Sequence, residues 1–551
     1  SRSVGCRIDL PRTTAKLVSV VCERPTMARR DDDGDTGAEP FETELAEMAE
    51  QDEPAIEFYG GKGVSALPIG LFIVWAIVQS GLFGISDTTG LVIGMLISLI
   101  VGMLFVRGDW KGYANTIFEG MTQRVAATAI VAWLWAGMFA STLQAGGFVD
   151  GLVWAATALD VGAALFPAAT FILAALLATG IGTGYGTAVA FTTLFFPAGV
   201  LLGANPVLVF GAILSGAVFG DNLAPVSDTT IVSAVTQDAD IGGVVASRFK
   251  YAIVPAMIAF VAYVVAGNLM PGIEVAGQAR EIFVDSANPA GLLHLVSMGV
   301  VIATAVRGRH IVEAISWGLI VAVAFNLLFD LAGPAEMLLF RAPARSGVAE
   351  AVAWLPIVEI AGSGESPGVA GSLYSGAEGF FPLIVLTLLI VAGARIMIRG
   401  GGFAALQEWL LSKVATTVTR AETTMVLGTA AVNAMITINT AAEIAIAPYI
   451  STIGRRFNLN GYRRANILDA NTSALGYIFP WAGGVLVGVA AMQGLPQEYA
   501  WFEPSMMVNP VAVVPYVFHG WLLVAMFLFA AWTGFGREYV ADREAGEVER
   551  A

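Results

Sequence analysis

The chain has 551 residues and a formal net charge of −15, with 56% hydrophobic and only 13% charged residues. Soluble domains carry about 25% charged residues, so this composition excludes an ordinary soluble protein. Windows of about 20 apolar residues follow one another along the sequence, which predicts an all-α polytopic membrane protein. Two cysteines and three scattered histidines exclude a disulfide framework and a thiolate metal site, and we expect neither a cofactor nor a nucleic-acid partner.

The negative charge is concentrated near the N-terminus. Between Ala28 and Glu57, twelve acidic residues accompany two arginines and account for −10 of the net charge. Because this stretch lacks helical apolar periodicity, we expect residues 1–60 to form a disordered acidic cytoplasmic tail. A transmembrane transporter domain is predicted over residues 61–540, followed by a charged cytoplasmic tail at 541–551.

Several apolar runs have the length and composition of a single membrane crossing. These simple spans are predicted at residues 66–85, 91–106, 126–145, 251–270, 291–306, 311–329, 380–394 and 514–532. Residues 330–378 read as a long polar connection, and residues 404–418 have the mixed pattern of an interfacial helix.

Two further apolar stretches are too long for one crossing and are interrupted near their middle. Residues 165–203 contain the glycine-rich run 180–187, and residues 423–452 contain the polar run 437–443. Each stretch is predicted to fold as a helical hairpin with its tip at the interruption. A dinucleotide-binding glycine loop is excluded for the first stretch, since no strand precedes it and no acidic residue follows at the required distance.

Two other apolar segments are interrupted by polar residues and read as broken helices. Residues 207–246 carry a polar group that begins at Asp221 and surrounds Pro225, and residues 465–492 carry a second group around Asp469. Proline lacks an amide hydrogen and breaks the helix, which frees backbone carbonyls. Discontinuous helices of this kind form the ion and substrate sites of secondary transporters. A loop between two short helices outside the membrane is the alternative for the first segment.

The placement of lysine and arginine predicts the orientation. If the basic turns are cytoplasmic, both termini are cytoplasmic and residues 331–378 lie outside, with only Arg341 and Arg345 opposing this assignment. The first hairpin then enters from outside and the second from inside, so the two hairpin and broken-helix pairs form inverted-topology repeats. The basic positions used are Arg107, Lys111, Arg124, Arg248, Lys250, Arg307, Arg309, Arg395, Arg399, Lys413, Arg420, Arg455, Arg456, Arg463, Arg464 and Arg537.

The interruptions supply carboxylate, amide and hydroxyl oxygens. Sodium, like calcium and magnesium, prefers hard oxygen ligands of these kinds. A carboxylate in low-dielectric surroundings favours its protonated form, whereas a bound cation favours the ionised form, so one site can hold either. Asp221 is the first choice for this role, and sodium is expected at Asp221 and its neighbours. Asp228 could instead cap the second half-helix. The candidate residues are Asp221, Asn222, Ser227, Asp228, Thr229, Asp469, Asn471, Thr472 and Ser473 in the breaks, and Thr183, Thr187, Asn439, Thr440 and Glu443 at the hairpin tips.

Three motifs resemble those of NhaC-type sodium/proton antiporters. Residues 215–230 read SGAVFGDNLAPVSDTT and closely resemble the signature of the first broken helix, while residues 182–187, GTGYGT, resemble the preceding hairpin. Residues 469–481 are similar to the second-half motif but are one residue longer. Leu468 stands where the family has a glutamate, and Ala482 where it has an asparagine. The resemblance implies the ion-transporter superfamily fold, with inverted repeats.

Together these features predict a secondary active transporter, not an enzyme, that exchanges sodium for protons across the cell membrane by alternating access. Because relatives with similar motifs exchange malate for lactate or move amino acids, a sodium- or proton-coupled organic acid or amino acid exchanger is the alternative. A non-transporting membrane sensor or scaffold is a third reading. The expected partners are sodium, protons and the lipid bilayer. Assembly of the chain into a homodimer is a further possibility.

Overall fold

The computed structural model describes residues 56–540, apart from 86, 109, 226, 274–287, 308, 344–346, 363–365, 406–407 and 409–415. Both predicted tails fall largely or wholly outside the described residues, since these begin at residue 56 and end at residue 540. Arg345, Lys413 and most of the interfacial helix predicted at 404–418 also lie outside them.

Helices dominate the described part of the chain. Eight helical stretches within it are long and apolar enough to cross a membrane, which confirms the all-α polytopic membrane fold. The predicted simple spans correspond to α2 (Leu67–Ala76), α3 (Thr88–Leu104), α5 (Arg124–Ala145), α11 (Ile241–Leu269), α13 (His294–Val306), α14 (Ile311–Leu328), α18 (Phe381–Arg399) and α25 (Phe518–Thr533). Of these, α3 and α13 are shorter than the eight long stretches, which also include Gly184–Leu201 and Pro206–Leu223. Two further helices, α4 (Trp110–Met121) and α6 (Phe148–Ala158), were not predicted from the sequence.

Both predicted hairpins are present. The first consists of α7 (Phe166–Ile181) and α8 (Gly184–Leu201), and the second of α20 (Val418–Ile436) and α21 (Asn439–Arg456). Each tip turns through one residue with left-handed backbone, Gly182 at φ 72° and Thr437 at φ 66°. Glycine adopts this conformation readily, whereas a β-branched residue does so only where its surroundings hold it. Thr437 is held because its carbonyl accepts a hydrogen bond from the Gly483 N–H at 3.0 Å.

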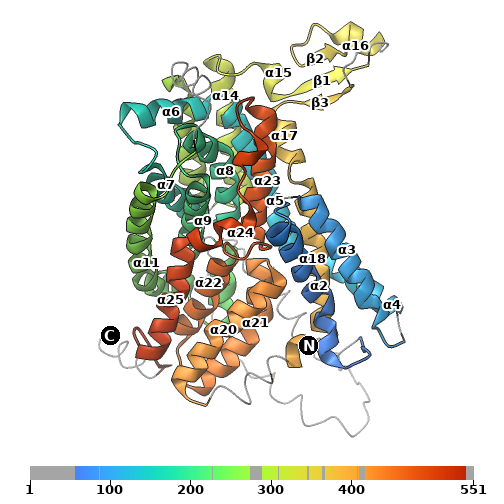
Figure 1. Cartoon of the computed structure of the whole chain (residues 1–551), viewed down its shortest axis with the longest axis vertical. Coiled ribbons are helices and arrows are strands. Elements are labelled where there is room, and N and C mark those ends of the chain that lie inside the picture. The colour runs from blue at the N-terminus through green and yellow to red at the C-terminus, as the bar shows by residue number, and fades with distance from the viewer. Residues whose placement is uncertain are drawn as a thin grey trace, which may run out of the picture.

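Both broken helices are also present. The first consists of α9 (Pro206–Leu223) and α10 (Asp228–Thr236), and the second of α22 (Gly461–Leu475) and α23 (Gly483–Glu498). Figure 1 shows the first hairpin in the upper half of the molecule and the second at its lower end. Their tips meet, because the Asn439 N–H donates to the Tyr185 hydroxyl at 3.3 Å. A hairpin followed by a broken helix therefore occurs twice from opposite ends, as the inverted repeat predicts.

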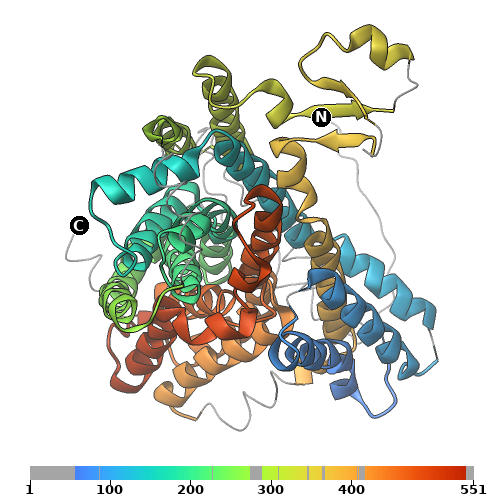
Figure 2. The ribbon, with the colours of Figure 1, turned by 45° about the horizontal axis from the view of Figure 1, so that its top comes forward.

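Residues 334–378 fold into a small unit rather than a plain polar connection. It contains α15 (Pro334–Met337), β1 (Leu339–Ala342), α16 (Gly347–Val352), β2 (Val358–Ile360), β3 (Gly368–Ala370) and α17 (Ser372–Glu378). Strand β1 lies in the middle of the sheet, parallel to β2 and antiparallel to β3. Figure 2 shows this sheet standing off the helical body. Strands of three or four residues are too short to give a period in the sequence.

Ion pairs hold the opposite, lower end together. Glu422 is fully buried and accepts hydrogen bonds from Arg463 at 2.7 Å and from Arg537 at 2.6 Å. Lys250 pairs with Glu538 at 2.7 Å. These contacts join the second hairpin, α22, α11 and the segment that follows α25. Arg463 is therefore a buried structural residue, although its place in the sequence marked it only as part of a basic turn.

Candidate functional site

The candidate site lies where the two helix breaks meet the two hairpin tips. All of the predicted site residues are buried except Asp228, which is partly exposed. The fourteen residues come from elements far apart in the sequence, yet contacts between their side chains link α9, α10, α21 and α22. The structure therefore brings the predicted residues from the breaks and from the second hairpin into one polar centre.

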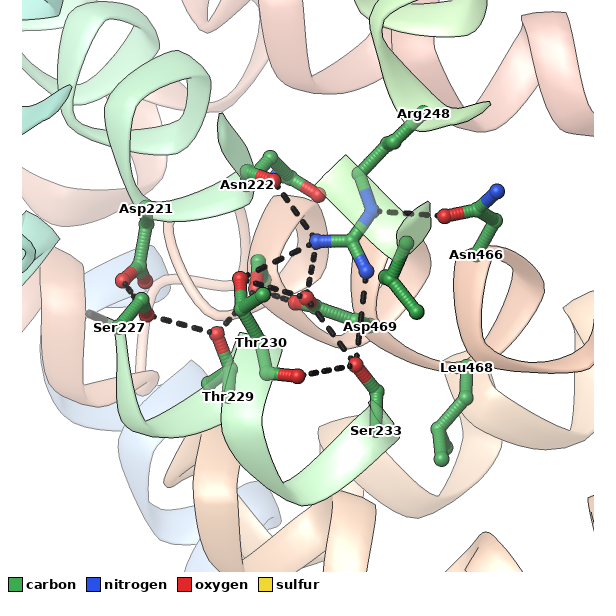
Figure 3. Close-up of polar contacts among 12 residues, drawn as sticks. Asp221, Asn222, Ser227, Thr229, Thr230, Ser233, Arg248, Asn466, Leu468 and Asp469 are labelled. Carbon is green, nitrogen blue, oxygen red and sulfur yellow. Dashed lines mark hydrogen bonds and ion pairs between the residues drawn. The ribbon is translucent and has the colours of Figure 1, made fainter. Parts of the chain in front are cut away.

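Asp221 lies in the last turn of α9 and is bounded by hydroxyl groups (Figure 3). Its Oδ1 accepts a hydrogen bond from Ser227 Oγ at 2.8 Å, and its Oδ2 accepts one from the Tyr477 hydroxyl at 3.2 Å. Ser227 Oγ also lies 3.0 Å from Thr229 Oγ1. Within the described part of the chain, no cationic side chain contacts Asp221. Its carboxylate is therefore buried without a charged partner.

Close packing of glycines fixes the position of Asp221. A Cβ atom at Gly216 or Gly220 would overlap α7, so α9 lies directly against the first hairpin. A Cβ atom at Gly184 would likewise overlap the Tyr477 hydroxyl. Gly184, in the glycine-rich motif of the first hairpin, therefore leaves room for Tyr477 to reach Asp221 across the hairpin tip.

Asp469 has different surroundings because a buried arginine neutralises it. Its Oδ1 accepts a hydrogen bond from Ser473 Oγ at 2.7 Å, and its Oδ2 forms an ion pair with Arg248. The side chains of Arg248 and Asp469 are both 0% exposed. A buried guanidinium is tolerated when an anion and further acceptors surround it.

The sequence interpretation of Arg248 as part of a basic turn is wrong. Helix α11 begins at Ile241 rather than at Tyr251, which places Arg248 within a helix and turns its side chain inward. Four further acceptors surround the guanidinium: the Asn222 carbonyl at 2.7 Å, Asn466 Oδ1 at 3.0 Å, Thr230 Oγ1 at 3.3 Å and Ser233 Oγ at 3.4 Å. Of these four residues, Asn222 and Thr230 belong to the polar run that begins at Asp221.

The second hairpin contacts both breaks. Thr440 Oγ1 donates a hydrogen bond to Asp228 Oδ2, and Thr472 Oγ1 donates one to Glu443 Oε1 at 2.9 Å. The N-cap position of α10 belongs to Ser227, and Asp228 is the first residue of that helix. Asp228 therefore links the first broken helix to the second hairpin instead of occupying the cap position.

Two of the predicted residues serve the hairpin tip itself. Thr183 is the N-cap of α8 and accepts a hydrogen bond from the Gly186 N–H at 3.4 Å. Thr187 Oγ1 donates to the Thr183 carbonyl at 3.0 Å. Because these hydrogen bonds are local, the structure gives both residues a part in shaping the tip and does not join them to the carboxylates.

Among the predicted site residues, four buried oxygens have no hydrogen-bond donor within the described part of the chain: Asn222 Oδ1, Asn439 Oδ1, Glu443 Oε2 and Asn471 Oδ1. Buried acceptors normally have a partner, so these oxygens are suited to a cation or to water. No group of three or more His, Cys, Asp or Glu residues in the described ranges forms a metal centre. The sodium ion predicted at Asp221 would be a transported substrate held mainly by hydroxyl, amide and carbonyl oxygens.

Comparisons with known proteins agree with this architecture. A family model described as "Na+/H+ antiporter family" matches residues 47–268 and 278–521. The chain is 23% identical over 476 residues to the arginine/ornithine antiporter ArcD of Halobacterium salinarum, which covers 83% of this chain and 92% of that protein.

Two other relatives match shorter regions. The malate-2H(+)/Na(+)-lactate antiporter of Bacillus subtilis is 26% identical over 204 residues, which is 37% of this chain and 43% of that protein. The Na(+)/H(+) antiporter NhaC of Alkalihalophilus pseudofirmus is 23% identical over 168 residues, or 30% and 36% of the two chains. The resemblance to NhaC-type antiporters is confirmed, and this protein is a multi-pass secondary antiporter that belongs to the Na+/H+ antiporter family.

Proposed function

We propose that this protein exchanges sodium for protons across the cell membrane by alternating access, and that Asp221 binds either ion in turn. The observation that carries the proposal is the burial of Asp221 at a helix break with no cationic partner among the described residues. A buried carboxylate without a partner is unstable as an anion, so it takes up a proton or a cation. Exchange results if the site turns from one side of the membrane to the other when Asp221 holds a proton or a sodium ion, and does not turn when the Asp221 carboxylate is empty.

The groups around Asp221 fit a sodium ion. Ser227 and Thr229 offer hydroxyl oxygens beside the carboxylate. The next residue along α9, Asn222, has a buried amide oxygen that no donor in the described chain occupies. Asp221 also lies in the last turn of α9, where the negative end of the helix dipole favours a cation. Hard oxygens at the end of a half-helix are a recurring form of sodium site in transporters.

The hairpin arrangement supports alternating access. The two tips enter from opposite ends and touch beside the helix breaks through Asn439 and Tyr185. Movement of one hairpin and broken-helix unit against the other would open the site toward one side at a time. This movement would expose Asp221 to sodium on one side and to protons on the other.

The lower end in Figure 1 is proposed to face the cytoplasm. At this end α18 ends at Arg399 and α21 ends at Arg456, opposite the small sheet of β1, β2 and β3. The enrichment of cytoplasmic turns in arginine and lysine then places both ends of the transporter domain inside and the sheet outside.

A second candidate is the exchange of organic acids or amino acids coupled to sodium or protons. The match over 83% of this chain to a protein named as an arginine/ornithine antiporter favours it. Asp221, Asp228 and Glu443 are carboxylates that could also receive the ammonium or guanidinium group of an amino acid. The substrate, rather than the fold, separates the two candidates.

Purified protein in liposomes that contain a pH-sensitive dye tests the proposal. An external pulse of sodium or lithium should raise the internal pH, and a choline pulse of equal strength should not. A response to arginine, ornithine, malate or lactate gradients without a response to sodium or lithium would overturn sodium/proton exchange and support the second candidate. No flux of either kind in folded protein would contradict both.

A further inference from the structure

The carboxylates at the two helix breaks have opposite electrostatic surroundings. Asp221 receives hydrogen bonds from Ser227 and Tyr477, both neutral donors. Asp469 forms a buried ion pair with Arg248. Leu468, beside Asp469, is fully buried and adds no second negative charge. One arginine therefore balances one aspartate in the second repeat, while the corresponding charge in the first repeat has no internal counter-ion among the described residues.

The acceptors around the Arg248 guanidinium resemble the ligand shell of a cation. They comprise one carboxylate, one main-chain carbonyl at a helix end, one amide oxygen and two hydroxyls, contributed by three different helices (Figure 3). Oxygens of these kinds bind hard cations, and the end of a half-helix is where transporters place them. The five are Asp469 Oδ2, the Asn222 carbonyl, Asn466 Oδ1, Thr230 Oγ1 and Ser233 Oγ.

We infer that Arg248 is a tethered cation that permanently occupies the site around Asp469, which closes this second site to sodium and to exchangeable protons. The inference rests on the proposed sodium/proton exchange and adds that Asp469 takes no part in carrying either ion. A guanidinium keeps its charge at every pH that proteins experience, so it cannot leave the site by losing a proton. Its side chain is buried and attached to α11, so it does not diffuse away as sodium does.

A purely structural clamp between α11 and α22 is the competing explanation of the same contacts. The two explanations predict different results of removing the guanidinium. If Arg248 is only a structural clamp, removing its guanidinium makes the protein less stable and creates no new ion-binding site. If Arg248 is a tethered cation, removing its guanidinium leaves Asp469 surrounded by oxygen ligands, and Asp469 can then bind a proton or a sodium ion. The test must therefore look for a gain of sodium-dependent proton release.

The experiment measures protons released on addition of sodium to purified protein in weakly buffered detergent, in the Asp221→Asn background. This background should release no protons. Adding Arg248→Gln should restore a release of about one proton per protein, because Asp469 becomes the titratable ligand. Adding Asp469→Asn to that protein should abolish the release again. Arg248→Lys is the matched control, since it keeps the positive charge and should restore nothing.

Two results would overturn the inference. The first is a folded Asp221→Asn/Arg248→Gln protein that releases no protons. The second needs no change at Arg248: if Asp221→Asn alone still releases protons and the addition of Asp469→Asn stops it, then Asp469 exchanges ions beside the arginine. Release that survives in Asp221→Asn/Asp469→Asn would contradict the proposed role of Asp221 and would leave Asp469 outside the exchange, as the inference requires.

Discussion

Replacing Ser227 with alanine is expected to weaken sodium binding by roughly ten- to a hundredfold. Ser227 Oγ donates to Asp221 Oδ1 at 2.8 Å, and both residues are buried. A hydrogen bond to a charged group contributes about 1.5–3 kcal/mol, and each 1.4 kcal/mol is about a tenfold change in an equilibrium constant. This bond stabilises the ionised carboxylate, which is the form that binds sodium. Without it the proton competes more strongly, so the apparent sodium affinity falls.

The substitution should affect the ion and leave the local fold largely intact. Ser227 occupies the N-cap position of α10, but its side chain makes no capping hydrogen bond that alanine would remove. The assay is the sodium concentration that gives half-maximal proton movement in vesicles, measured at several pH values. Ser98→Ala is the matched control, because Ser98 is a buried serine of α3 whose hydroxyl donates to the Gly94 carbonyl at 2.7 Å. An unchanged sodium affinity in Ser227→Ala would refute the assignment of this pair to the sodium site.

Two further predictions concern stability and orientation. Glu422→Gln should destabilise the protein by about 3–5 kcal/mol, because it leaves the buried Arg463 guanidinium without its carboxylate. Thermal denaturation measures this loss of stability. The control is Glu359→Gln, which removes a carboxylate from an exposed ion pair and should change stability little. Equal losses of stability in the two variants would contradict the prediction. In a chain whose native cysteines are replaced, Trp354→Cys should react with a membrane-impermeant thiol reagent from outside and Arg456→Cys only from inside. Labelling of both positions from one side would contradict the inverted topology.

The hairpins and broken helices could be predicted because their signals are local. Glycine at position 182 and proline at position 225 interrupt apolar runs, and a helix cannot continue through such residues without local rearrangement. Polar side chains next to these interruptions had to face the protein interior, since lipid offers them no hydrogen-bond partner. Most of the candidate site, including Asp221 and Asp469, therefore followed from sequence position alone.

The role of Arg248 could not be predicted in the same way. Its partner Asp469 lies 221 positions further along the chain, and no local pattern links the two. The enrichment of basic residues in cytoplasmic turns treats each arginine as a marker of a turn, and it fails where a helix begins earlier than the apolar run suggests. Tyr477 was missed for a related reason: its hydroxyl reaches Asp221 only through the close packing of the hairpin tip.

Sodium-driven proton movement in vesicles that contain Asp221→Asn tests the central claim most directly. Asparagine removes the titratable group at nearly constant volume, and loss of a buried charge also removes its desolvation cost, so the variant should fold. Exchange should collapse in Asp221→Asn, whereas Asp228→Asn should be milder because the amide oxygen can still accept the hydrogen bond from Thr440. Full exchange in Asp221→Asn at matched protein levels would contradict the account and move the proton to another carboxylate, with Glu443 the next to test.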